Sequence, residues 1–342
     1  MTNVANVTNV TVEQLASPLM TRVLPAIYTA VFIVSMPCNL LALILLCRLR
    51  NQATPTVIYS INLCIADLLF SATLPLQVDY HLRGNNWIFG KVTCGISTVT
   101  FYCNMYCSIF TACAIALERY CGVVIPLRTR HLRSSHKAIL NCLLMWVLFL
   151  VFQMPYVLHD LTLSVQELNI TTCFDVLPKE VFNGRKGLLY FISIYLLFFV
   201  LPMVILVACY CFVARALRQA LDAGVKRSHK RTQALVILAA VCFITCYLPN
   251  MIVQLIHMFY RMQGKSIYAT YKLTLGLNSL NCCFDPFVYY LASTELRQAL
   301  WRLLRQWNCC PNAMREENAG SVLSEMPCSI RVNQNDDRSL IS

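Results

Sequence analysis

Four polar residues of this 342-residue chain could do chemistry together, although each stands in a long apolar stretch: Asp67, Ser108, Asn281 and Asp285. Polar groups in apolar surroundings are costly, so such residues are candidates for function. Two carboxylates with two neutral oxygen ligands are what a monovalent cation such as sodium needs. Hydrogen bonds between neighbouring helices, worth ~0.6–2 kcal/mol each, would explain the same residues without an ion. The sequence supports both interpretations equally.

Catalytic chemistry finds little support in the residue pattern. The chain has no HExxH sequence and no paired CxxC sequences, which are the usual signs of a zinc site. Most of its 19 cysteines lie inside apolar runs, where a thiol packs as a small polarizable group. No nucleophile and base stand out as a pair. We therefore predict that the protein is not an enzyme.

The composition predicts a membrane protein. Apolar residues make up 58% of the chain and charged residues only 13%, compared with ~25% charged in soluble domains. Segments of about 20 apolar residues can span a bilayer as helices. We expect an all-α bundle of seven transmembrane helices at residues 24–47, 56–80, 92–118, 138–158, 187–213, 233–260 and 268–291.

The distribution of Lys and Arg predicts the orientation of the bundle. The first, third and fifth connections and the C-terminal part contain more than twice as many Lys and Arg residues as the N-terminal part and the other loops. This bias places residues 1–23 outside and the tail in the cytoplasm. The glycosylation sequons at Asn6, Asn9 and Asn169 then all lie outside. The residues behind the net charge of +12 lie mainly in these connections, and the sequence contains no nucleic-acid-binding motif. We therefore expect no nucleic-acid partner.

A short amphipathic helix is expected after the seventh span, over residues 294–307, with leucines on one stripe and arginines on the other side. Cys309 and Cys310 follow it and are candidates for palmitoylation, which would anchor the helix to the membrane lipid; two unmodified thiols are the alternative. Residues 308–342 are polar and are expected to be a disordered cytoplasmic tail.

The third span connects the two sides of the membrane. From Cys94 to Arg119 a helix is roughly 37 Å long, slightly more than the ~30 Å hydrocarbon core of a bilayer. The span ends in the charged sequence Glu118-Arg119-Tyr120. Six spans contain a proline that can kink the helix: Pro37, Pro75, Pro155, Pro202, Pro249 and Pro286.

Glu118-Arg119-Tyr120 resembles the (D/E)RY motif of rhodopsin-like, class A G-protein-coupled receptors. The resemblance covers residues 22–308 and has anchors in every span: Asn39, Leu63, Asp67, Trp146, Pro202, Tyr210, Phe243, Cys246, Pro249, Asp285-Pro286 and Tyr289. Residues 87–90 and 101–106 and the acid at Asp285 are similar to the branch of nucleotide, protease-activated and lysolipid receptors. Residues 171–177, 271–275 and 285–290 are similar to the metabotropic purinoceptor-like series within it.

The resemblance implies roles for particular residues. Cys94 and Cys173 would form a disulfide that pins the second outer loop. Arg119 would pair with Glu118 at rest and turn toward a heterotrimeric G protein when active, with Tyr210 and Tyr289 moving in beneath it. Such a receptor would lie in the plasma membrane, and its tail would bind arrestin and receptor kinases.

The resemblance also implies that Asp67, Ser108, Asn281 and Asp285 hold an allosteric sodium ion. Phe243 and Tyr247 would form a packing switch above Pro249, with Asp285-Pro286 as a second hinge. Tyr247 departs from the family pattern, since many relatives have Trp or Phe there.

Cations and tyrosines near the outer ends of the spans suggest the ligand. Candidate residues for the pocket are His81, Tyr102, Arg185, His257, Tyr271 and Lys272. Such a set suits an anionic ligand with an apolar part: a lysophospholipid, a lipid conjugate or a nucleotide. The alternative is that lysines at helix ends only extend to the membrane interface.

Three other classes of protein fit the sequence less well. A protease-activated peptide receptor needs a cleavable N-terminus, but the only basic residue before the first span is Arg22. A retinal protein needs a lysine deep in the last span, and residues 277–283 contain none. A transporter is expected to show inverted repeats, which are not visible.

Overall fold

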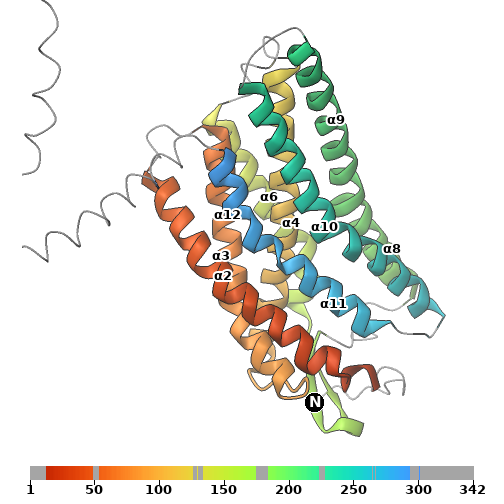
Figure 1. Ribbon diagram of the computed structural model, residues 1–342. Helices are drawn as coiled ribbons and strands as arrows, with labels where there is room; N and C mark the ends of the chain where they lie inside the picture. The colour runs from red at the N-terminus through yellow and green to blue at the C-terminus, as the bar shows by residue number, and fades with distance from the viewer. Residues whose placement is uncertain are drawn as a thin grey trace, which may run out of the picture. The chain divides into compact units, whose positions relative to one another are not determined.

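The computed structural model describes a helical bundle (Figure 1). It describes residues 13–48, 54–125, 129, 134–174, 184–222, 228–263, 265, 267–292 and 300, without the side chains of 184–186, 217, 220–222, 228–240, 243, 261–262 and 288–292. The predicted glycosylation sites Asn6 and Asn9, the cysteines Cys309 and Cys310, nearly all of the predicted amphipathic helix and the tail lie outside the described residues.

Most of the described residues lie in seven helical rods. They are α2 (Leu24–Arg48), α3 (Pro55–Leu82), α4 (Gly90–Val123), α6 (Ser135–Leu158), α8 (Gly184–Tyr195) continued by η5 (Leu196–Val200) and α9 (Leu201–Asp222), α10 (Ser228–Met262), and α11 (Tyr268–Ser279) with α12 (Asn281–Ala292). Each predicted span falls within one rod. Five helices among the described residues are apolar and long enough to cross a membrane unaided: Glu13–Arg48, Pro55–Leu82, Gly90–Val123, Ser135–Leu158 and Gly187–Ala216.

Local sequence sets the starts of two rods. Thr54 caps α3 by accepting a hydrogen bond from the Val57 backbone N–H, and Pro55 fills the first helical position, where no N–H partner is needed. Ser134 caps α6 in the same way through Lys137 N–H. Capping satisfies N–H groups that the first turn of a helix leaves without a partner.

The third and second predicted spans form the centre of the bundle. Within their most apolar stretch, 67% of α3 and of α4 is buried, compared with 28% of α6. The 94–119 stretch therefore belongs to one of the two most buried of these five helices. Tyr106 and Phe110 of α4 pack against Phe149 of α6 and Phe198 of η5, with ring centroids 4.6–6.0 Å apart.

Two rods are interrupted where the sequence predicted continuous spans. The fifth contains the π-helical turn η5 just before Pro202, whose missing N–H and ring disturb the preceding helical hydrogen bonds. The seventh turns at Leu280, which separates α11 from α12 (Figure 1). Pro286 cannot donate a helical hydrogen bond to the Cys282 carbonyl, and Asn39 Nδ2 of α2 donates to that carbonyl at 2.9 Å.

An antiparallel hairpin follows α6, which an all-helical expectation did not include. Strands β1 (Thr162–Val165) and β2 (Ile170–Cys173) pair with Thr162 opposite Cys173, and η4 (Gln166–Leu168) lies in the connection. Asn169 has a φ of 51°, a left-handed conformation that asparagine tolerates better than most residues. It is exposed at the turn, where its sequon is accessible.

The chain before the first predicted span is also packed, although we expected an extracellular segment through residue 23. The π-helical turn η1 (Leu19–Val23) continues into α2, and Leu15 and Met20 are almost fully buried. They belong to an apolar cluster with Phe70, Leu74 and Tyr268. Long-range apolar contacts hold this segment, and the sequence pattern did not reveal them.

Candidate functional site

Asp67 lies at the centre of the polar cluster inside the bundle and is fully buried. Its Oδ1 accepts a hydrogen bond from Asn104 Nδ2 at 2.8 Å. Its Oδ2 has no hydrogen-bond partner among the described residues, although the Cys282 thiol, a weak donor, interacts with the carboxylate. One oxygen of a buried carboxylate is therefore left for a further ligand.

Asp285 completes the cluster from α12. Its Oδ2 accepts a hydrogen bond from Asn281 Nδ2 at 2.6 Å, and its charge is close enough to interact with that of Asp67. Tyr247 of α10 interacts with both Ser108 and Asp285. The structure thus brings together the four residues that the sequence predicted as a set. Asp285 is partly buried, and two neighbouring carboxylates inside the bundle repel each other, so a bound cation would offset that repulsion.

Sequence reasoning missed several polar members of this cluster. Asn104 lies one helical turn before Ser108, on the same face of α4, and that spacing could have identified it. The Cys282 thiol donates to Asn104 Oδ1 at 3.4 Å, so this cysteine takes part in the polar network and does not only fill space. Asn39 also reaches Ser35 Oγ, which is 2.9 Å from Ser71 Oγ. These contacts continue the polar network from α4 through α12 to α2 and α3.

The predicted switch is partly described. Tyr247 is 2% exposed, and Pro249 lies inside α10. The side chain of Phe243 is outside the described residues. Asn250, which the sequence did not single out, is buried beside the proline and accepts a hydrogen bond from Thr274 Oγ1 of α11 at 3.2 Å. The part of α10 beside Pro249 is therefore hydrogen-bonded to the seventh rod.

The cytoplasmic end of α4 differs from the predicted resting pair. Glu118 Oε2 accepts a hydrogen bond from Thr56 Oγ1 of α3 at 2.5 Å. Arg119 lies close enough to Tyr210 of α9 to interact electrostatically, and among the described residues it forms no ion pair with Glu118 in this conformation. Consecutive residues on a helix point about 100° apart, so their side chains diverge.

Tyr120 packs beside this pair. It lies with Tyr210 and Val124 around the fully buried Val213, and its ring is 5.8 Å from that of Phe212. The side chain of Tyr289 is outside the described residues. The described G-protein-coupling candidates thus lie between the inner ends of α4 and α9.

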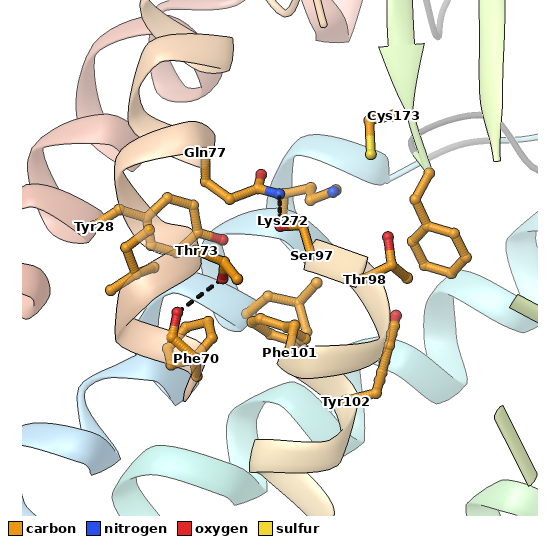
Figure 2. A pocket seen from close by; sticks show the side chains of 13 residues that line it. Tyr28, Phe70, Thr73, Gln77, Ser97, Thr98, Phe101, Tyr102, Cys173 and Lys272 are labelled. Carbon is orange, nitrogen blue, oxygen red and sulfur yellow. Dashed lines mark hydrogen bonds between the residues drawn. The ribbon is translucent and has the colours of Figure 1, made fainter. Parts of the chain in front are cut away.

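A cavity opens between the outer ends of the rods, and Figure 2 shows its lining side chains, ten of them labelled. The space amounts to about 470 Å³, part of it open to solvent. It is lined by Tyr28, Phe70, Thr73, Leu74, Gln77, Ser97, Thr98, Phe101, Tyr102, Cys173, Phe174, Lys272 and Leu275. Aromatic and aliphatic groups dominate this wall, and Gln77 Nε2 donates to Ser97 Oγ at 2.8 Å.

Four predicted ligand residues lie in or beside one side of this cavity, and two of them, Tyr102 and Lys272, line it. The hydroxyls of Tyr102 and Tyr271 are 3.2 Å apart. The His257 ring stacks on Tyr271, with centroids 5.1 Å apart and planes 2° apart. Lys272 lines the cavity, and its Nζ is 5.6 Å from the Tyr268 ring centroid. Among the described lining residues Lys272 is the cation, and the other side chains are aromatic, aliphatic or neutral polar. Such a wall suits an amphiphilic anion.

Another predicted ligand residue, His81, lies away from this cavity. His81 is 1% exposed, is not among the lining residues, and has its Nδ1 2.5 Å from Asn85 Oδ1. The side chain of Arg185 is outside the described residues. At the outer end of α3, Arg83 forms a hydrogen-bonded ion pair with Asp79. The hydrogen bond to the carboxylate raises the pKa of Arg83.

The outer hairpin is fastened to the bundle at two points. Cys94 and Cys173 form a disulfide with a Cα–Cα distance of 5.7 Å. The Trp87 N–H donates to the Thr171 carbonyl at 2.7 Å. The disulfide that the resemblance implied is therefore confirmed, and it places Phe174 in the cavity wall.

Comparison with known proteins decides the family. Residues 38–289 match the family model described as 7 transmembrane receptor (rhodopsin family). The chain is a rhodopsin-family G-protein-coupled receptor. It is 40% identical to purinoceptor 8 of Gallus gallus over 298 residues, covering 86% of this chain and 83% of the relative. It is 39% identical to the S-geranylgeranyl-glutathione receptor of Homo sapiens over 328 residues, covering 94% and 90%.

A second group of relatives belongs to the protease-activated receptors. The receptor is 36% identical to proteinase-activated receptor 1 of Xenopus laevis over 307 residues, which cover 89% of this chain and 71% of that relative. Family membership confirms the predicted seven-helix fold, the non-enzymatic function and a multi-pass location in the plasma membrane. It also implies coupling to a heterotrimeric G protein and an extracellular ligand.

Proposed function

We propose that the receptor binds an anionic lipid conjugate in the outer cavity and then catalyses nucleotide exchange on a heterotrimeric G protein. The observation that carries this proposal is the position of Lys272, a cation on a wall otherwise made of aromatic, aliphatic and neutral polar groups. The human relative is named for a ligand of this chemistry, in which an isoprenoid chain is joined to an anionic peptide.

The cavity offers separate environments for the two parts of such a ligand. Phe70, Leu74 and Phe101 give an apolar surface that would favour a hydrocarbon chain by excluding water from it. Lys272 would pair with a carboxylate, and the Tyr102 and Tyr271 hydroxyls could donate hydrogen bonds to the head group. A nucleotide would place a purine or pyrimidine against the same wall.

Replacing Lys272 by glutamine should weaken activation by S-geranylgeranyl-glutathione about tenfold or more, because a hydrogen bond to a charged group contributes ~1.5–3 kcal/mol. The measurement is a concentration-response curve with a G-protein dissociation sensor. Lys265→Gln is the matched control, because Lys265 is exposed and does not line the cavity. Equal potency in the two variants would contradict the role of Lys272, and a response to nucleotides alone would contradict the lipid conjugate.

The protease-activated relatives support a second candidate, a receptor that responds to its own cleaved N-terminus. The segment from residue 13 packs against the bundle, with Asn85 Nδ2 donating to the Leu15 carbonyl at 2.6 Å. Release of an N-terminal epitope tag by trypsin or thrombin, with simultaneous signalling, would favour this function over the lipid conjugate.

We also propose that Asp67, Ser108, Asn281 and Asp285 hold a sodium ion, with Asn104 orienting the first of them. Asp67 Oδ2 supports this assignment, because among the described residues only the weakly donating Cys282 thiol interacts with this carboxylate apart from Asn104 on Oδ1. A sodium ion would supply positive charge between the two carboxylates. The side chains around it would fix the spacing of α3, α4 and α12.

Asp67→Asn should abolish the dependence of thermal stability on sodium. At a sodium concentration tenfold above the dissociation constant, bound ion stabilises the folded receptor by about 1.4 kcal/mol. The melting temperature of purified receptor is compared in sodium chloride and in N-methylglucamine chloride. Asp79→Asn is the control, because Asp79 is an exposed carboxylate at the outer end of the same helix. A sodium response that survives in Asp67→Asn would refute the site.

The remaining assignments follow from the family. We propose that Glu118, Arg119, Tyr120, Tyr210 and Tyr289 form the surface that couples to the G protein. Movement about Pro249 and Pro286, with Phe243 and Tyr247 as the packing switch, would expose this surface. The tail would bind arrestin and receptor kinases, Cys309 and Cys310 would be palmitoylated, and Asn6, Asn9 and Asn169 would carry glycans.

A further inference from the structure

A second hollow lies on the outside of the bundle, between the outer ends of α4 and α6. Its empty volume is about 860 Å³, including open space. It is lined by Lys91, Val92, Gly95, Ile96, Val99, Thr100, Tyr156, Val157, Leu158, His159 and Asp160. Neither the candidate ligand site nor the sodium cluster uses it. We name it the α4–α6 groove.

The groove has an apolar wall that faces outward from the bundle. Val92 is 68% exposed, Ile96 57%, Val157 57% and Leu158 69%. These residues belong to predicted membrane-spanning segments, so hydrocarbon rather than water surrounds them. Gly95 has no side chain to fill the hollow, and a Cβ there would come 3.7 Å from the Tyr156 carbonyl oxygen. The absent side chain leaves space beside the backbone of α6.

The length of the groove matches part of one lipid chain. From Lys91 to Thr100 the helix rises roughly 13 Å, close to the ~15 Å depth of one leaflet's hydrocarbon region. The groove begins at the outer end of α4 and runs toward the membrane centre. An acyl chain parallel to its neighbours in the outer leaflet would lie along it.

Charged side chains gather at the outer end of the groove. Lys91, His159 and Asp160 are all exposed there. Asp160 is held in place because its Oδ1 accepts hydrogen bonds from the Thr162 backbone N–H at 2.9 Å and from Thr162 Oγ1 at 2.6 Å. A cation and a carboxylate at one lip are complementary to a head group that carries both a phosphate and an ammonium.

We infer that the α4–α6 groove binds a zwitterionic phospholipid of the outer leaflet. One acyl chain lies between α4 and α6, the phosphate meets Lys91, and the quaternary ammonium meets Asp160. Tyr156 lines the groove and stacks on Tyr102, a residue of the outer cavity wall, with ring centroids 5.7 Å apart. The bound lipid therefore supports one side of the ligand cavity.

The test uses full-length receptor in lipid nanodiscs that contain a trace of phosphatidylcholine with a diazirine in its acyl chain. After illumination, labelled peptides are quantified by mass spectrometry. We expect labelling to concentrate in residues 91–100 and 156–160. Uniform labelling around the bundle would overturn the inference. Stronger labelling by an equivalent phosphatidylglycerol or sterol probe would overturn the zwitterionic assignment.

Matched variants separate a specific site from general lipid contact. Val157→Trp fills the groove, whereas Val147→Trp makes the same change on the same helix at a residue that is 59% exposed and does not line the groove. Labelling of the α4 peptide should fall about fivefold or more in Val157→Trp, by loss of apolar burial, and stay unchanged in Val147→Trp. Equal labelling in the two would overturn the proposal.

A second pair tests the head group and guards against misfolding. Lys91→Gln should reduce labelling of the α6 peptide about threefold, because the lost ion pair is exposed, while Lys265→Gln should not. Val92→Trp blocks the groove from the α4 side, and its effect is measured as the labelling of the same α6 peptide. If either Trp variant fails to yield monodisperse receptor, the other decides, and unchanged labelling in it overturns the proposal.

Discussion

Arg119→Ala is expected to reduce nucleotide exchange by the receptor roughly 10- to 100-fold. A guanidinium forms strong, directional hydrogen bonds with acceptors of its partner, and losing one set costs ~1.5–3 kcal/mol. Arg119 lies near Tyr210 and is not held by Glu118, so it is available at the inner surface. The rate of guanine-nucleotide exchange is measured with purified receptor and a panel of heterotrimers, with and without S-geranylgeranyl-glutathione.

The matched control for this variant is Arg48→Ala. Arg48 ends α2 and is exposed, so its removal takes away the same charge without touching α4. Arg119→Ala should keep surface expression and thermal stability close to those of the parent, because it removes no buried apolar contact. Exchange that stays at parental rates would show that coupling does not depend on Arg119. A comparable loss in Arg48→Ala would indicate a general effect of positive charge.

Breaking the disulfide should have the largest effect on stability. Cys94 and Cys173 close a loop with a sequence separation of 79, and removing such a crosslink typically costs ~2–5 kcal/mol, mainly by freeing the unfolded chain. Cys94→Ser should therefore lower the melting temperature and surface expression. The cavity should also loosen, because Phe174 lies next to the crosslink in its wall. Thermal unfolding of purified receptor measures the first effect.

Serine variants of other cysteines serve as controls. Cys47→Ser changes an exposed free thiol and should leave the melting temperature unchanged. The double variant Cys94→Ser with Cys173→Ser should be no less stable than either single variant, because the first substitution already removes the bond. Additive losses in the double variant would mean that the cysteines stabilise the receptor through packing instead.

Much of the architecture could be predicted from residue patterns. Seven apolar runs of spanning length must become helices, because a bilayer offers no partner to an unpaired peptide group. Thr54 and Ser134 mark helix starts through local capping. The polar set of Asp67, Ser108, Asn281 and Asp285 stood out because each interrupts an apolar run, and the receptor brings the four together.

Other features arise from contacts between residues far apart in the chain, which periodicity does not encode. Near the turn at Leu280, Pro286 leaves the Cys282 carbonyl without a helical hydrogen bond. Asn39, which lies 243 residues before Cys282, donates to that carbonyl. The hairpin depends on pairing across a turn and on its link to α4. Leu15 is buried because α2, α3 and α11 leave an apolar space for it.

Side-chain direction explains the remaining differences. Glu118 and Arg119 are neighbours in sequence, yet the helix points one toward Thr56 and the other toward Tyr210. His81 resembled a ligand residue by position but faces Asn85 inside the protein. A sequence shows which groups are costly to bury, and only the packed helices show which partner each of them meets.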